Sequence, residues 1–381
     1  MQNKRNIKMR DRLFAGLLLT IGFLLIRNNA HAMHISEGIL PLNWAVFWLA
    51  IAMPFVAFGL YKVKKLSSVD LSFKPLIGLM AAVVFIISCM PIPVPTAGTC
   101  SHPCGTGISG ILLGPYVSIL VSAAALLIQA LFLAHGGLST WGADIVSMGV
   151  MGSFAGYLTF KGLRALKANL WIAGFAAGLL ADWATYTTTS IELASGIRGD
   201  SPFLPLFWKI LIAFIPTQLP LGILEGAMTA GMIVLLYKKR PDMLMKLGVV
   251  KMEVRIQKSE YRSQNIGDRS QKTEDGSQKS EDRKQNIITP LLILLTLLSL
   301  LFSTPTFAEE SKWPGVDESV VEKYAAEHGR EARQPIINTD QGDLLLFVFL
   351  LAGTVGGFIG GYCWRILIAE KPNKAKREHL E

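Results

Sequence analysis

Three histidines lie in short polar segments beside long apolar runs, where they could together bind a transition-metal ion. His34 precedes the first long apolar run, His102 lies in the glycine-rich loop 96–107, and His135 follows the run at 108–134. Imidazole nitrogens are common ligands of nickel, copper, cobalt and zinc. The spacing alone leaves two alternatives open, a shared metal site and three unrelated histidines.

The segment before His34 predicts a further ligand, a free N-terminal amine. Basic residues, the apolar stretch 13–26 and an Ala-His-Ala sequence ending at Ala32 follow one another in the order of a cleaved signal peptide. Cleavage there makes Met33 the first residue, so that its amine, the deprotonated His34 amide and the His34 imidazole can chelate one ion. His102 would complete a roughly planar nitrogen set, which favours Ni(II) or Cu(II) and admits Co(II). The alternative is an uncleaved signal anchor.

Other polar groups lie in or beside the apolar runs. Cys100 and Cys104 could be soft ligands, a disulfide or inert small residues, and we favour the last because thiolates would hold an ion too tightly for release. Asp144, Asp182 and Glu225 are unfavourable in lipid, so they should face the protein interior. We prefer hydrogen bonding between helices over a place on an ion path for these three carboxyl groups.

Composition indicates a membrane protein with several spans. Of the 381 residues, 51% are hydrophobic and 17% charged, and the mean hydropathy is +0.41. The net charge of +9 includes many Lys and Arg residues between apolar runs, where they orient helices, so nucleic-acid binding is not expected.

Apolar runs long enough to cross a bilayer, which takes about 17–25 residues, predict an all-α polytopic fold. Basic clusters at 62–65, 161–167 and 238–240 all lie inside only if 108–134 makes an even number of crossings. We therefore expect two short segments or a re-entrant piece there, broken near Gly114-Pro115, with the three histidines on the outer side. The runs lie near 42–60, 75–95, 108–134, 143–160, 170–190, 205–237, 288–307 and 343–368.

Changes in residue composition along the chain divide it into four parts. A signal peptide is predicted at 1–32 and a metal-binding membrane domain at 33–240, followed by a polar, disordered cytoplasmic linker at 241–286. The part at 287–381 starts like a second signal sequence and contains two spans. In its last span two rows of small residues recur at every fourth position, one from Gly353 and one from Ala352, which favours packing against another helix.

Four motifs in order resemble the CbiM/NikM substrate-binding (S) components of energy-coupling factor (ECF) transporters for cobalt and nickel. They are MHISEG at 33–38, SHPCGTG at 101–107, LAHGG at 133–137 and PLGILEG at 220–226. The segment 309–368 is similar to the small two-span accessory component of these systems, of the CbiN/NikN type. Threonine is usual in the family at the position of Cys104, which puts the redox behaviour of that loop in doubt.

The resemblance implies a seven-span S-component core plus a two-span accessory module, with Met33, His34 and His102 as the metal ligands. Glu37, Ser101 and His135 are expected to surround them. No cofactor is expected. The transported ion would be Co(II), or alternatively Ni(II), and the expected use is cobalamin synthesis or a nickel enzyme.

The family also implies separate partners, a transmembrane coupling protein (CbiQ/NikQ-like) and ATPase subunits (CbiO/NikO-like). The protein would be a multi-pass component of the bacterial inner membrane with its mature N-terminus outside. The chain has no Gly-x-x-x-x-Gly-Lys-Ser/Thr loop and no His-Glu-x-x-His motif, so it carries no recognisable ATPase or zinc protease of its own. The alternatives are a membrane scaffold or assembly factor and an intramembrane metallohydrolase.

Overall fold

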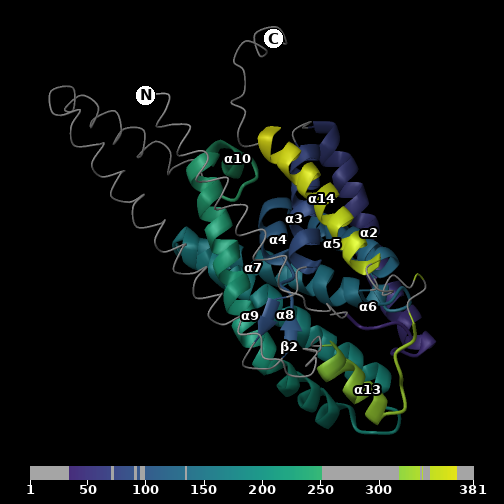
Figure 1. The fold of residues 1–381 in the computed structure, drawn as a ribbon. Coiled ribbons are helices and arrows are strands. Elements are labelled where there is room, and N and C mark those ends of the chain that lie inside the picture. Colours follow the sequence, from purple (N-terminus) through teal and green to yellow (C-terminus); the bar gives the residue numbers. More distant parts are fainter. Residues whose placement is uncertain are drawn as a thin grey trace, which may run out of the picture. The chain divides into compact units, whose positions relative to one another are not determined.

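The computed structural model describes residues 34–69, 73–89, 92–94, 99–133, 135–250, 317–334, 337 and 344–366. The signal segment, Met33, the apolar run at 288–307 and most of the predicted linker lie outside these residues. The described residues are mostly helical (Figure 1), which confirms the predicted all-α class.

Long helices form most of the structure. The α-helices are α2 (Leu42–Val69), α3 (Phe73–Cys89), α4 (Thr106–Leu113), α5 (Pro115–Phe132), α6 (Trp141–Asp144), α7 (Ser153–Ala165), α8 (Leu170–Ile197), α9 (Phe203–Lys239), α10 (Pro241–Lys246), α13 (Lys323–Glu327) and α14 (Leu344–Trp364). The π-helices are η1 (Ile145–Gly152) and η2 (Asp317–Glu322), and the strands are β1 (Ile92–Val94) and β2 (Thr99–Ser101).

Three helices of the described part, α2, α5 and α9, have the length and apolar composition needed to cross a bilayer. α3 and the end of α14 are apolar but shorter. α6, η1 and α7 follow one another without a gap over residues 141–165. The predicted number of seven spans stays a prediction.

The apolar run at 108–134 is broken where the sequence predicts. Gly114 has a positive φ of 77°, and Pro115 occupies the first turn of α5. Every residue of α4 is buried, and its Gly107 approaches α8 so closely that an added Cβ would lie 2.8 Å from the Gly178 Cα atom. A short, protein-enclosed helix therefore follows the His102 loop directly.

The connection before α4 differs from the expectation. The apolar run at 75–95 ends its helix at Cys89, and residues 92–94 instead form β1, which pairs antiparallel with β2. Pro93 pairs with Cys100 in this hairpin, and proline at this position would disrupt a helix. The hairpin places a defined backbone immediately before His102.

Residues 241–250, which the sequence predicts to be the start of a polar linker, pack on the core instead. α10 and the residues after it pack on the core, with Leu244 fully buried and Val249 and Val250 each 7% exposed. These apolar side chains explain the difference, because burying their surface away from water lowers the free energy of the folded chain.

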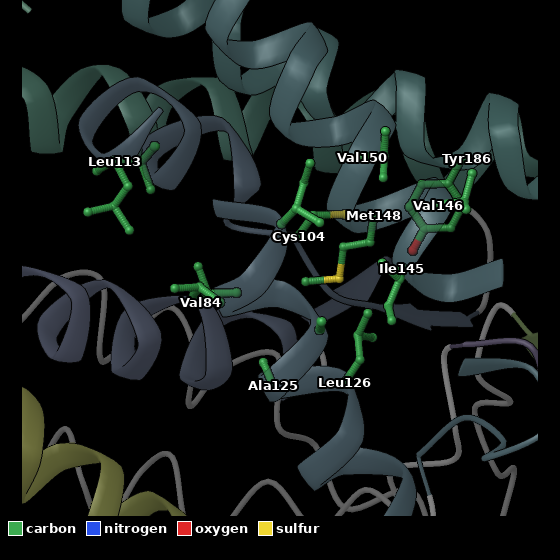
Figure 2. Packing of buried hydrophobic residues seen from close by; sticks show 14 of the residues in the cluster. Val84, Cys104, Leu113, Ala125, Leu126, Ile145, Val146, Met148, Val150 and Tyr186 are labelled. Atoms are coloured by element: carbon green, nitrogen blue, oxygen red, sulfur yellow. The ribbon is translucent and has the colours of Figure 1, made fainter. Parts of the chain in front are cut away.

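Buried aliphatic and aromatic side chains from α2–α9 form the core, part of which appears in Figure 2. Cys104, 2% exposed, belongs to this cluster together with Val84 and Met148. The loop that carries His102 is therefore embedded in the protein rather than laid over its surface.

α14 packs against α3 through one of the two rows of small residues. An added Cβ at Gly360 would lie 3.4 Å from the Ala82 Cβ atom, and one at Gly356 would lie 3.7 Å from Ile86. Gly353, Gly357 and Gly361 have no such neighbour within 4 Å among the described residues. The packing predicted for this span is confirmed for the row that contains Gly356 and Gly360.

Candidate metal centre

His34, His102 and His135 converge on one point. Their ring centroids are 4.8 to 5.1 Å apart, and one potential ligand nitrogen from each lies within 4.8 Å of the others. His34 lies before α2, His102 follows β2, and His135 lies between α5 and α6. His102 and His135 are 1% and 3% exposed, and their Nε2 atoms are 3.1 Å apart. The fold therefore brings together the three histidines that the spacing alone left as either a shared site or unrelated residues.

Burial holds these imidazoles in the neutral form that a metal requires. It lowers the pKa of His34 to about 4, although a hydrogen bond with Gln129 opposes the shift. It also lowers the pKa values of His102 and His135 well below the ordinary histidine value, and repulsion from the neighbouring histidines adds to the effect. A neutral imidazole offers a lone pair, so the imidazoles themselves need not lose a proton when a cation enters.

Gln129 of α5 orients His34. The Gln129 amide NH₂ donates to Ser88 Oγ at 2.7 Å, which leaves its Oε1 atom 2.9 Å from His34 Nε2. Since Oε1 can only accept, His34 Nε2 carries the proton and Nδ1 has the free lone pair. Nδ1 is also the nitrogen nearer the main chain, as chelation together with the N-terminal amine requires.

We expect Gln129→Met to weaken Co(II) binding by about 10- to 100-fold, the usual effect of losing a group that orients a ligand. Gln129→Glu restores an acceptor for the His34 N–H and should recover most of the affinity. Calorimetric titration of the purified protein with Co(II) measures both variants, and thermal unfolding shows whether each is folded. Equal affinity of Gln129→Met and the unchanged protein would contradict the orienting role.

Main-chain contacts hold the segment after His34 against the loop that contains His135. Gly137 N donates to Ile35 O at 3.0 Å, and Ser139 N donates to Glu37 Oε2, also at 3.0 Å. An added Cβ at Gly137 would lie only 2.7 Å from the Glu37 Cα atom, so glycine is required for this approach. Glu37 thus helps to hold the segments of His34 and His135 together through its carboxylate, which accepts the Ser139 amide.

Side chains of α8 and α9 fix the other side of the site. Ser101 Oγ accepts from Gln218 Nε2 at 3.1 Å and lies 3.3 Å from the Tyr186 hydroxyl. Glu225 accepts the Cys104 and Gly105 amides at 2.7 and 2.9 Å. The His102 loop is therefore tied to the middle of α9.

The carboxyl groups of the apolar runs are buried, as the sequence predicts: Asp144, Asp182 and Glu225 are 5%, 0% and 2% exposed. Asp144 accepts a hydrogen bond from Ile35 N at 3.3 Å, and Glu225 accepts the two amides described above. Asp182 is different, because neither of its oxygens has a hydrogen-bond partner among the described residues. The preferred interpretation, hydrogen bonding between helices, is therefore wrong for Asp182, and Asp144 and Glu225 accept main-chain amides of segments between helices rather than groups of another helix.

The structure brings some of the predicted site residues together and places others against neighbouring segments. His34, His102 and His135 share one cluster, although His135 was expected only to surround the ligands. Glu37 and Ser101 hydrogen-bond to neighbouring segments instead. Gln129 escaped the sequence analysis, and its only signal there is a lone amide in an apolar run.

Comparison with known proteins gives matches over both halves of the chain. A family model described as "Cobalt uptake substrate-specific transmembrane region" (CbiM) matches residues 34–243. A cobalt transport protein CbiM of Geobacter sulfurreducens is 63% identical over 362 residues, which are 95% of this chain and 97% of that protein. A cobalt transport protein CbiM of Sorangium cellulosum is 56% identical over 220 residues, 58% of this chain and 98% of that protein.

A solved structure is also similar. The crystal structure of a transition metal transporter aligns with 54% of this chain and 93% of its own, at 27% identity and a TM-score of 0.47. The family match at 34–243 includes all three clustered histidines and Gln129.

Proposed function

Because the chain belongs to the CbiM family of cobalt-uptake transmembrane proteins, we propose that its three-histidine cluster captures Co(II) for import. The chain is a membrane component of cobalt transport and not an enzyme. The observation that carries the proposal is the convergence of three neutral imidazoles at the segment where a processed N-terminus would begin.

The proposed ligand set combines the clustered imidazoles with the N-terminus. Cleavage after Ala32 frees the Met33 amine, which joins the His34 amide nitrogen and His34 Nδ1 in adjacent chelate rings. His102 supplies the fourth nitrogen. His135, with its Nε2 atom 3.1 Å from that of His102, is close enough to add a fifth from outside the plane.

Cobalt is the first choice of cargo and nickel the alternative. Roughly planar nitrogen ligation favours Ni(II), while a fifth ligand suits Co(II) because that ion accepts several geometries. The names of the two relatives, both cobalt transport proteins, support cobalt. Cobalamin synthesis is the proposed use of the imported metal.

Transport needs an energy source outside this chain. We assign the chain to the ECF class, in which a CbiQ-like coupling protein and CbiO-like ATPases act on the substrate-binding component. This assignment accords with the lack of a phosphate-binding loop in the sequence. The protein would lie in the inner membrane with its mature N-terminus on the outer side, where the metal arrives.

The proposed domains are the signal segment 1–32, the metal-binding domain 33–240, extended by the packed residues to 250, a linker to 286 and the accessory module 287–381. The Sorangium relative supports a boundary of this kind, since 98% of its length matches only 58% of this chain. Hydrogen bonds join the accessory segment to the metal-binding domain, Arg333 N to Glu37 O at 2.7 Å and Ser36 Oγ to Glu322 at 3.1 Å.

The test is metal uptake by bacterial cells that lack their own cobalt and nickel importers. Cells that express the whole chain with a CbiQ-like protein and CbiO-like ATPases should accumulate radioactive cobalt, and nickel more slowly. Cells without the chain are the control. Equal accumulation with and without the chain would refute import, and faster accumulation of nickel would reverse the choice of metal.

A further inference from the structure

We propose that Cys104, Asp182 and Glu225 form a second site for a divalent transition-metal ion, separate from the three histidines. One potential ligand atom from each, a thiol sulfur and two carboxylate oxygens, lies within 4.8 Å of the others. The three residues come from the loop before α4, from α8 and from α9. All are nearly or fully buried, being 2%, 0% and 2% exposed in that order.

Within the part of the chain that the structure describes, Asp182 has no partner that explains its burial. Its side chain is fully buried and neither oxygen hydrogen-bonds to a described residue. An added Cβ at Gly222 would lie 3.1 Å from Asp182 Oδ2, so α9 approaches the carboxyl group there with a residue that lacks a side chain. An unpaired buried carboxylate is strongly unfavourable, and a bound cation removes that cost.

Glu225 is already oriented for coordination. Each of its oxygens accepts one main-chain amide, from Cys104 or Gly105. A carboxylate oxygen can accept more than one interaction, so both retain capacity for a cation. The same hydrogen bonds bring the Cys104 main chain to α9. They therefore hold the loop that carries the thiol against the Glu225 carboxylate.

The ligand types favour Co(II), Ni(II) or Zn(II) over Mg(II) or Ca(II). Thiolate sulfur binds the borderline transition metals, whereas the hard cations prefer sites made of oxygen alone. Binding exchanges protons for the ion: the thiol proton and any carboxyl proton leave as the metal–sulfur and metal–oxygen bonds form. No electrons are transferred.

The position of this cluster suggests a transit site, in place of the inert role expected for Cys104. Because binding displaces the thiol proton, return of that proton breaks the metal–sulfur bond and allows release. His102 and Cys104 are two residues apart, a separation of at most about 7 Å along the chain. α4 begins just after Cys104 and, at about 1.5 Å per residue, extends about 12 Å. Its far end at Leu113 and Gly114 lines a cavity of about 390 Å³ that Lys161 and Lys246 also line.

An ion leaving the histidines therefore meets the Cys104–Asp182–Glu225 cluster before the region of these lysines. The role in transit rests on the proposed cobalt import. The capacity to bind Co(II) does not, so the two claims fail under different results.

Absorption spectroscopy tests the binding. Purified full-length protein titrated with Co(II) should develop the near-ultraviolet charge-transfer band of a cobalt–thiolate bond and bind two ions per chain. Cys104→Ser should lose the band. Asp182→Asn should lower the affinity for the ion that gives rise to the band by about tenfold or more. Cys363→Ser, which changes another buried cysteine on α14, should leave the band intact.

Asp182→Asn is the sharper variant because it preserves shape and removes no hydrogen bond. Its thermal unfolding midpoint should equal or exceed that of the unchanged protein, since an unpaired buried carboxylate is lost. A band that persists in Cys104→Ser, or that is absent from the unchanged protein, overturns the second site. One ion bound through His102, with normal uptake and no band, overturns it while leaving the proposed function intact.

Uptake separates the transit role from simple binding. Asp182→Asn should lower the initial rate of cobalt uptake by about tenfold, while the affinity of the ion bound by the histidines stays within about twofold. If the band follows Cys104 and Asp182 but the uptake rate of Asp182→Asn is normal, the site binds metal and the transit role is wrong. Failure of cobalt uptake by the unchanged chain would instead refute the proposed function.

Discussion

Replacing His102 by alanine is expected to reduce cobalt uptake to the level of cells without the protein. The imidazole is one of three that converge within 4.8 Å, and it is the proposed ligand that joins the N-terminal chelate to the rest of the protein. Losing it removes one metal–nitrogen bond and leaves the chelate exposed to water on one side. We expect the affinity for Co(II) to fall by at least about 100-fold.

His102→Ala leaves a hole beside His135, so His102→Gln serves as a second variant that fills the space and keeps a polar group. Both variants should bind Co(II) poorly, and the two should unfold at similar temperatures. The matched control is His328→Ala, whose imidazole Nδ1 pairs with the Tyr324 carbonyl oxygen at 2.8 Å, outside the histidine cluster. Uptake that is unchanged in His102→Ala, with the protein present in the membrane, would refute capture by this cluster.

Local rules were sufficient to predict the helices and the break between α4 and α5. A glycine before a proline interrupts a helix by its own conformational preferences, and the positions of basic residues required the chain to turn back there. The hairpin of β1 and β2 was missed because Ile92 and Val94 continue an apolar run and give no strand signal of their own. Length and apolarity alone predicted a longer helix.

The histidine cluster was only partly predictable. The charge pattern predicted that His34, His102 and His135 lie on one side of the membrane, but their convergence depends on how α5 and α6 approach the segment after His34. The role of Gln129 depends on the same packing, because a lone amide in an apolar helix signals a buried partner without naming it. Prediction of the site from sequence is therefore limited mainly by how far apart along the chain its residues lie.

The Cys104–Asp182–Glu225 cluster illustrates that limit most clearly. Asp182 and Glu225 are 43 residues apart in sequence, and close packing of α8 on α9, which Gly178 and Gly226 permit, brings them together. Considered one at a time, each residue favoured an ordinary structural role. Only their convergence, together with the two unpaired oxygens of Asp182, points to a ligand.

Blocking cleavage after Ala32 is expected to abolish high-affinity Co(II) binding without changing any residue of the histidine cluster. Ala32→Glu places a charged side chain where signal peptidase requires a small one. The chain would then keep an amide at Met33, whose nitrogen lone pair is delocalised into the carbonyl, so that this nitrogen could bind a metal only after losing a proton, whereas a free amine offers its lone pair directly. We expect the affinity to fall by at least about 100-fold, measured by Co(II) titration together with N-terminal sequencing.

Ala32→Ser is the matched control, since serine is small enough for cleavage, and it should bind and import cobalt normally. The comparison isolates the amine because the two variants differ at one position outside the mature chain. If Ala32→Glu remains uncut and still binds Co(II) with full affinity, the amine is not a ligand, and the three imidazoles must suffice. If it loses binding while Ala32→Ser retains it, proteolysis completes the metal site, and the precursor cannot take up cobalt before it is processed.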